Sequence, residues 1–267
     1  MTFDRCSGER AKPLAELLAE PNARAIVTDG TRFAIDNTRL ARIEVTECDV
    51  FLGREDAAPL FLARGETEHM LDFRAAAALL PPDDVALLSY ALGMLNWSAR
   101  TRFCGACGSA LESRGAGYSR ACPHCKLEVF PRLDPAVMIL ATHEGRLLLA
   151  RHQGRIANMW STLAGFVEPG ETLEEAVARE LFEEAGLVAK TIRYFGSQPW
   201  PLPASLMIGF EVETESDAIR IDETELIEAR FFRREDLDDI TTSSRISLSG
   251  QMIGAWRATR SAAPRSD

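Results

Sequence analysis

The chain has 267 residues, 46% of them hydrophobic and 26% charged, as expected for a soluble globular protein of one large domain or two ordinary ones. Its net charge of −10 argues against a nucleic-acid partner held mainly by phosphate attraction, although metal cations can still join an acidic enzyme to a phosphorylated ligand. No apolar run approaches the ~20 residues that cross a bilayer, and the N-terminus lacks the apolar core of a signal peptide. We therefore expect a cytoplasmic protein without a membrane partner, in which the six cysteines are thiols or metal ligands.

The first segment, residues 1–100, predicts a small α+β domain. Short apolar stretches separated by turn residues indicate strands, and a helix-like tract follows from Phe73 to Arg100. The pair Pro81-Pro82 should interrupt that tract. Cys6 and Cys48 stand alone in the sequence and are expected to be inert thiols.

The second segment, residues 101–130, predicts a zinc ribbon. Its cysteines follow the spacing C-x2-C-x14-C-x2-C, at Cys104, Cys107, Cys122 and Cys125. Two such knuckles complete a tetrahedral site, and four protein ligands leave no open position, so the zinc should be structural. The segment is too poor in large apolar residues to fold unaided. His124 lies inside the second knuckle and is expected to face solvent.

The third segment, residues 131–260, alternates strand-like and turn-like pieces around one helix, and the tail at 261–267 is expected to be disordered. It opens with AVMILATHEGRLLLARH, two apolar runs around a turn that predict a β-hairpin. The helix should begin after Thr172, whose side chain can form a capping box with Glu175, and end at Gly186. Its core-facing residues recur at four-residue spacing: Leu173, Val177 and Leu181.

The acidic residues of this helix are the unusual feature. Glu180, Glu183 and Glu184 fall within one arc of about 100° near the C-terminal end, where both mutual repulsion and the helix dipole disfavour them. Divalent cations such as Mg²⁺ or Mn²⁺ would reverse this cost, because they prefer carboxylate oxygens. The alternative for isolated glutamates is a solvated, charged helix face.

The pattern around these glutamates resembles the Nudix box. Gly165, five residues, Glu171, seven residues and then RELFEEAGL match the box at its fixed positions. The Nudix superfamily hydrolyses nucleoside diphosphates linked to another moiety, and the resemblance implies an α/β/α sandwich with a mixed sheet. It also implies catalytic roles for Glu180, Glu183 and Glu184. The implied ligands of Mg²⁺ or Mn²⁺ are the Ala164 carbonyl, Glu180, Glu184 and a later carboxylate, assigned to Glu225 with Glu223 and Glu228 nearby.

A second stretch, SQPWPLPAS, is similar to the SQPWPFPxS pattern of NADH pyrophosphatases of the NudC type, with Leu202 where that pattern has Phe. Its prolines stiffen a loop, Trp200 offers a flat surface and the polar groups can bind a nucleotide. The alternative is a rigid structural loop. The implied substrate contacts are Gln198, Pro199, Trp200, Pro201, Leu202, Pro203, Ala204 and Ser205.

Further implied substrate contacts are Phe130, where the family often has Tyr, then Arg74, Ser247 and Glu225. The resemblance implies hydrolysis of NADH, and less effectively NAD⁺, to AMP and the nicotinamide mononucleotide, by a homodimer that can also remove NAD caps from RNA. Two alternatives stay open: a Nudix hydrolase of another substrate such as ADP-ribose, and a non-catalytic nucleotide-sensing module.

Overall fold

A computed structural model describes residues 3–44, 46–154 and 158–259, so the tail expected to be disordered lies outside the described residues. The chain divides into two compact units. The first comprises residues 1–133 together with 199–204, and the second comprises 134–198 together with 205–267. The sequence-based division had placed 199–204 within the Nudix domain, whereas these residues pack with the first unit.

The first unit is built on a mixed sheet in the order β1-β5-β6-β2-β3-β4, with β7 paired to β3. Its strands are β1 (Phe3–Asp4), β2 (Arg24–Thr28), β3 (Arg32–Asp36), β4 (Arg39–Leu40), β5 (Val50–Glu55), β6 (Ala58–Arg64) and β7 (Met70–Asp72). A 3-10 turn, η1 (Ser7–Ala11), and the short helix α1 (Leu14–Leu18) precede β2. The expected α+β character of this segment is confirmed.

Two helices follow the sheet, α2 (Phe73–Leu79) and α3 (Pro82–Arg100). The Asp72 carboxylate caps α2 by accepting hydrogen bonds from the backbone of Arg74 and Ala75. The tract breaks at Pro81-Pro82 as predicted, because proline is tolerated in the first turn of α3 but not within a helix. Buried residues of α2 and α3, including Ala76 and Leu88, pack on the sheet in one core.

The ribbon follows α3 and contains the three-stranded sheet β10-β9-β8. Its elements are β8 (Glu112–Arg114), the 3-10 turn η2 (Gly115–Gly117), β9 (Ser119–Ala121) and β10 (Glu128–Val129). All its strand pairs are antiparallel. Few of its side chains are buried, consistent with a segment that needs more than an apolar core to fold.

The second unit is a sandwich around a mixed sheet in the order β15-β16-β11-β12-β17, with β14 paired to β11. Its strands are β11 (Asp134–His143), β12 (Arg146–His152), β13 (Met159–Trp160), β14 (Leu163–Phe166), β15 (Ala189–Trp200), β16 (Ser205–Thr214), β17 (Leu226–Phe232) and β18 (Thr241–Thr242). The helical elements are α4 (Leu173–Ala185), η3 (Glu235–Asp238) and α5 (Leu248–Ala258). The hairpin predicted from AVMILATHEGRLLLARH is β11 and β12.

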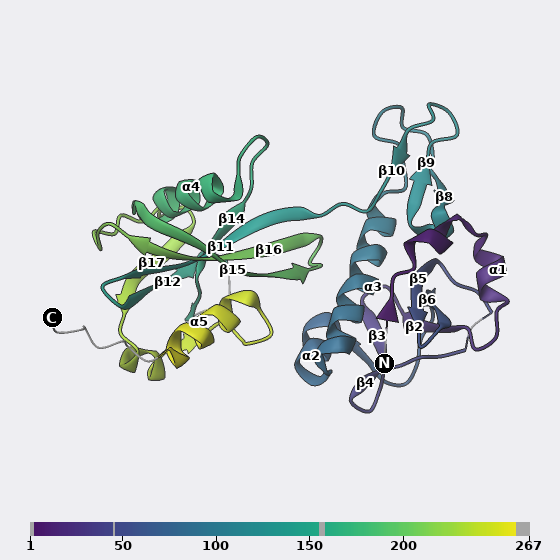
Figure 1. The fold of residues 1–267 in the computed structure, drawn as a ribbon, viewed down its shortest axis with the longest axis horizontal. Helices are drawn as coiled ribbons and strands as arrows, with labels where there is room; N and C mark the ends of the chain where they lie inside the picture. Colours follow the sequence, from purple (N-terminus) through teal and green to yellow (C-terminus); the bar gives the residue numbers. More distant parts are fainter. Residues whose placement is uncertain (1–2, 45, 155–157, 260–267) are drawn as a thin grey trace. The chain divides into compact units, whose positions relative to one another are not determined.

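Alternation along β11 divides the interior of this unit into two layers. Val137 and Ile139 pack in the core that includes Val177 and Leu181 of α4. Met138 and Leu140 point the other way, into the core that includes α5. Figure 1 shows α4 and α5 on opposite sides of the sheet, which confirms the α/β/α arrangement. Among the described residues, no helix is long and apolar enough to cross a membrane.

Candidate active site and zinc centre

The acidic helix α4 is fixed at both ends by its sequence. The Thr172 hydroxyl accepts a hydrogen bond from the Glu175 amide, and the Glu175 carboxylate accepts one from the Thr172 amide. Gly186 ends the helix in the left-handed conformation, with φ of 68°. The predicted capping box and glycine stop are both confirmed. They set where along the sheet the glutamates of α4 lie.

Gly165 on β14 makes room for the carboxylate of Glu180. A Cβ atom at residue 165 would lie 1.8 Å from Cδ of Glu180 and 1.9 Å from its Oε1. No side chain other than hydrogen fits there without displacing the carboxylate. Ala164, the preceding residue on β14, is paired with Met138 of β11, so the backbone beside this carboxylate belongs to the sheet.

Arg179 connects three carboxylates of the site. Its guanidinium donates to Glu171 through Nε at 2.6 Å and Nη2 at 2.9 Å, and through Nη1 to Glu180 at 2.8 Å and Glu183 at 2.9 Å. It also donates to the Phe166 carbonyl at 2.9 Å, which ties α4 to the end of β14. Hydrogen bonds from Arg179 lower the pKa of Glu171 to about 2. Neither Arg179 nor Glu171 was predicted to have a role, although both are fixed positions of the box.

The three glutamates expected to be catalytic differ in exposure. Glu180 and Glu184 are buried, with 9% and 2% of their surface exposed, whereas Glu183 is largely exposed. Burial raises the pKa of Glu180, and the negative charges of Glu183 and Glu225 raise it further against the opposing effect of Arg179. Glu225 directly precedes β17.

The neighbouring candidates for the later carboxylate make other contacts. Glu228 is paired with Arg151, whose Nη2 lies 2.8 Å from Oε2 of Glu228. The Glu223 backbone carbonyl accepts a hydrogen bond from the Gln153 side chain. The assignment of the later carboxylate to Glu225 stays a prediction.

The proline-rich loop is anchored to the first unit. Nδ2 of Asn96, on α3, donates to the carbonyls of Pro201 at 2.8 Å and Pro203 at 3.2 Å. The half-buried Trp200 ring packs edge-on against Phe73, with ring centroids 5.8 Å apart. These contacts give the loop the structural role that the sequence analysis had left open as an alternative. Leu202 is partly exposed and Pro201 is buried.

Residues at the two ends of this stretch lie in strands of the second unit. Ser205 is buried at the start of β16, opposite Asp134 of β11. Gln198, near the end of β15, donates from Nε2 to the Ile246 carbonyl at 2.8 Å. The exposed residue Pro199 and the half-exposed residues Pro203 and Ala204 complete the predicted set.

The remaining predicted contacts have distinct surroundings. The Arg74 guanidinium carbon lies 5.9 Å from the centre of the Trp200 ring, so Arg74 is beside the proline-rich loop. Phe130 follows β10 and is 58% exposed. Ser247 is the N-cap of α5, where its hydroxyl accepts from the Gly250 amide and donates to the Ser244 carbonyl. Ser247 thus has a structural function independent of any ligand.

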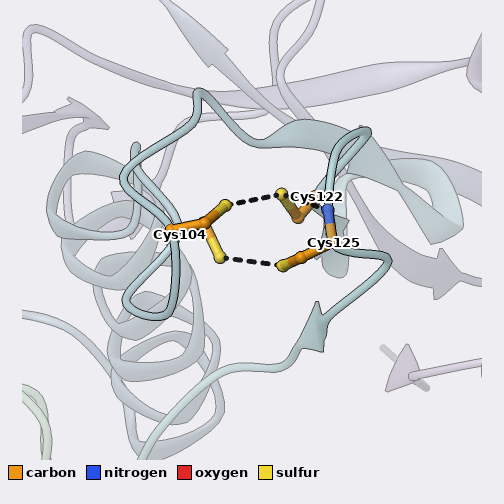
Figure 2. A group of neighbouring side chains, drawn as sticks. Cys104, Cys122 and Cys125 are labelled. Carbon is orange, nitrogen blue, oxygen red and sulfur yellow. Dashed lines mark hydrogen bonds between the residues drawn. The ribbon is translucent and has the colours of Figure 1, made fainter.

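The four ribbon cysteines converge, and Figure 2 shows Cys104, Cys122 and Cys125 pointing toward one another. Their sulfur atoms lie within 4.8 Å of one another, and the Cys104–Cys125 and Cys107–Cys122 sulfur pairs are both 3.5 Å apart. A tetrahedral zinc–thiolate site has Zn–S bonds of about 2.3 Å and sulfur–sulfur edges of about 3.8 Å. The cysteines therefore fit a structural Zn²⁺ ion.

The backbone of the two knuckles has the same form. The amide of Gly108 donates to the carbonyl of Cys104, and the amide of Lys126 donates to the carbonyl of Cys122. His124 is exposed, as expected, and is not part of the cluster. Elsewhere in the chain Cys6 and Cys48 are half-buried, and burial raises the pKa of both thiols, that of Cys48 to about 11, which fits their expected inertness.

The acidic site also fits a divalent cation by its chemistry. All its donors are oxygen atoms, which Mg²⁺ and Mn²⁺ prefer, and Gly165 leaves a cradle for one of the carboxylates. Within the described part of the chain, however, the four cysteines are the one cluster in which three or more potential metal ligands lie within 4.8 Å of one another. The potential ligands counted are histidine, cysteine, aspartate and glutamate side chains. The carboxylates are instead spaced around Arg179.

Comparisons with known proteins agree with this arrangement. Residues 132–248 match the NUDIX domain family and residues 99–130 match the NADH pyrophosphatase zinc ribbon domain. A protein of Stutzerimonas stutzeri (strain A1501), named NAD-capped RNA hydrolase NudC, is 36% identical over 219 residues, covering 80% of this chain and 79% of that protein. Its namesake in Pseudomonas syringae pv. syringae (strain B728a) is 40% identical over 178 residues, covering 67% of this chain.

This chain covers 63% of the length of the Pseudomonas syringae relative. Among solved structures, a NUDIX hydrolase from Nitrosomonas europaea aligns with a TM-score of 0.47 at 24% identity, covering 54% of this chain and 85% of that one.

The second unit has an acidic helix packed beside a glycine of a mixed sheet, and the NUDIX family matches the same residues. This unit is therefore a Nudix domain. The ribbon immediately before it matches the NADH pyrophosphatase zinc ribbon domain. Together with the similarity that extends along 80% of the sequence, it shows that the chain belongs to the NudC family of Nudix hydrolases.

Proposed function

We propose that this protein hydrolyses the pyrophosphate bond of NADH and NAD⁺, and of NAD caps at RNA 5′ ends, giving AMP or a 5′-phosphorylated RNA together with the nicotinamide mononucleotide. The observation that carries the proposal is the intact acidic site, with Glu180 held against Gly165 and Glu184 buried beside it on α4. The substrate class follows from the relatives, which are named NAD-capped RNA hydrolases.

The residues that would hold divalent cations are Glu180, Glu184 and Glu225, with the carbonyl of Ala164. A bound Mg²⁺ or Mn²⁺ ion would neutralise pyrophosphate oxygens and lower the pKa of a water molecule. The burial of Glu180 and Glu184 favours this use, because buried carboxylates interact more strongly with a cation than solvated ones.

The chain itself positions the reacting groups. Arg179 donates hydrogen bonds to both Glu180 and Glu183, so the two carboxylates have restricted orientations. Either Glu183 or Glu184 accepts the proton of the attacking water as general base. Water then adds to one phosphorus atom while the oxygen bridging the two phosphates leaves with the other. Most of the rate would come from positioning and electrostatics.

The substrate's nucleoside parts would be recognised outside the box. In this proposal Trp200, with Arg74 beside its ring, and Phe130 supply surfaces for the planar rings, and the exposed part of the proline-rich loop contributes the remaining contacts. The loop is held by Asn96 before any ligand binds, which lowers the entropic cost of binding. We also propose a homodimer, as the family resemblance implies.

The test is a substrate panel with products identified by chromatography and mass spectrometry, run with and without Mg²⁺ or Mn²⁺. Glu184→Gln should lower the rate of NADH hydrolysis by about 10²-fold or more, the contribution of a well-placed catalytic group. Glu228→Gln is the matched control, because Glu228 is engaged with Arg151.

Each alternative function predicts a different result. Faster turnover of ADP-ribose than of NADH or NAD-capped RNA would replace the proposed substrate. NADH binding without turnover in either metal would favour a sensing module. Full activity of a folded, metal-loaded Glu184→Gln variant would refute the assigned role of Glu184.

A further inference from the structure

A basic pocket lies where α3 joins the ribbon, and hydrolysis of a free dinucleotide gives it no role. It has a volume of about 480 Å³ and is open to solvent. We call it the ribbon pocket and define it by four residues that line it: Arg64, Arg102, Phe103 and Arg120. All four belong to the first unit. The volume is within the ~300–1,000 Å³ range of small-ligand sites.

The lining of the ribbon pocket is positively charged in a protein whose net charge is −10. No acidic side chain lines it among the described residues. Arg64 has one acidic neighbour, Asp49, at 3.3 Å, and both side chains are about half exposed. Within the described part of the chain, neither Arg102 nor Arg120 forms an ion pair with a carboxylate.

Arg120 is held in place by neutral groups. Its Nη2 donates to the Ser98 hydroxyl at 2.7 Å and its Nη1 donates to the Thr101 carbonyl, so the side chain is tied to the end of α3. Burial lowers the pKa of Arg120, and the positive charge of Arg102 lowers it further. Arg102 and Arg120 both line the ribbon pocket, so an anion bound in it would interact with two positive charges.

Phe103 adds an exposed aromatic ring to these charges. Its side chain is 63% exposed, and the guanidinium carbon of Arg102 lies 6.0 Å from the ring centre. The backbone beneath the ring is fixed, because Phe103 pairs with Ala110 and the next residue, Cys104, is part of the zinc-ligand cluster. The ribbon therefore presents a large aromatic ring to solvent on a backbone that is fixed by its neighbours.

We propose that the ribbon pocket binds the single-stranded body of an RNA substrate, with phosphates on Arg102 and Arg120 and a base stacked on Phe103. Arginine forks match phosphate oxygens, and bases stack on aromatic side chains whatever their sequence. The proposal extends the proposed function, since only a capped RNA, and not free NADH, has further phosphates and bases to contribute. The ribbon pocket is locally positive, so the net negative charge of the chain does not prevent RNA from binding there.

The test measures RNA binding apart from catalysis. The probe is a short, uncapped, fluorescently labelled single-stranded RNA, and its affinity is measured by fluorescence anisotropy over a series of salt concentrations. Phe103→Ala should weaken binding by about 5-fold or more, the effect of losing one stacked base. Arg102→Gln should weaken it and reduce the slope of log affinity against log salt by about 0.7, the value for one phosphate contact on a single strand.

The controls separate this site from general charge and from misfolding. Arg24→Gln removes an exposed arginine at the start of β2, outside the ribbon pocket, and should leave the salt slope unchanged. Arg102→Lys keeps the charge and should restore most of the slope. Zinc content and thermal unfolding show that each variant retains its ribbon. A duplex of the same sequence should bind more weakly, because its bases are not free to stack.

Unchanged RNA affinity in the Arg102→Gln/Phe103→Ala double variant would overturn the proposal, as would equal losses for single strand and duplex or for Arg24→Gln. The proposed function fails separately. Loss of RNA affinity with normal hydrolysis of NADH supports the pocket and leaves the catalytic assignment intact. RNA binding that depends on the pocket, in a protein that hydrolyses no NAD derivative, supports the pocket and refutes the catalytic assignment.

Discussion

Replacing Gly165 by alanine tests whether the position of the Glu180 carboxylate determines activity. The added Cβ would lie 1.8 Å from Cδ of Glu180, whereas an ordinary contact is at least 3.4 Å. Going from 1.8 Å to 3.4 Å requires a relative movement of about 1.6 Å. Gly165 is not among the glycines with positive φ, so alanine introduces no backbone strain, and the displaced group is the end of a side chain.

The expected loss follows from that displacement. A misplacement of about 1 Å can cost about 10²-fold in rate, so Gly165→Ala should lower kcat/KM for NADH by at least that factor, or about 2.7 kcal/mol of transition-state stabilisation. The free energy of unfolding should change far less than after a large core substitution, because the group that must move is the end of one side chain.

The assay compares steady-state hydrolysis and Mn²⁺ affinity of Gly165→Ala with those of the unaltered protein. Gly196→Ala is the matched control, since Gly196 is also in a strand of this sheet and a Cβ there meets no atom within 4 Å. Activity within threefold of the unaltered protein would refute the reasoning. So would an equal loss in the control variant.

Two further predictions concern stability. Zinc removal by a chelator should unfold the ribbon and leave the cooperative thermal unfolding of the second unit intact, so two separate thermal transitions should appear. An unchanged circular dichroism spectrum of the protein after zinc loss would contradict this. Asp84→Asn should lower the free energy of unfolding by about 3–5 kcal/mol, because the fully buried carboxylate accepts hydrogen bonds from Arg39, Arg42 and the Leu40 amide. Burial alone would raise the pKa of Asp84, but its arginine partners lower it overall, so its contribution is complete above a carboxyl's usual pKa of about 4 and is lost as pH falls through the lower folded value. Urea unfolding should therefore show the two proteins converging in stability at acidic pH, and a constant difference would exclude this role.

The sequence predicts those parts of the fold that depend on neighbours along the chain. The capping box of Thr172, the glycine stop at Gly186 and the proline break between α2 and α3 all follow from residues within one or two turns. The ribbon is predictable for the same reason, since the spacing of its cysteines encodes the two knuckles. Each of these features is local, so periodicity and turn chemistry are sufficient.

Features that depend on distant partners could not be predicted. The Asn96 side chain hydrogen-bonds the carbonyl of Pro201, which lies 105 residues away in the sequence. No pattern in either segment predicts this hydrogen bond. The ion pair between Arg39 and Asp84 likewise joins two segments that are distant in the sequence, so it could not be predicted either. Ser247 shows the opposite problem, because a serine expected to contact the substrate also caps α5. A residue type suited to a role in binding is equally suited to a local structural role.

The crowding of glutamates on α4 has an explanation within the protein as well as outside it. Arg179 neutralises part of the charge, since its guanidinium hydrogen-bonds Glu171, Glu180 and Glu183. Crowding alone is therefore weak evidence for metal binding. Stronger evidence comes from the balance of charge around Arg179, because a single guanidinium cannot neutralise the three carboxylates that it contacts.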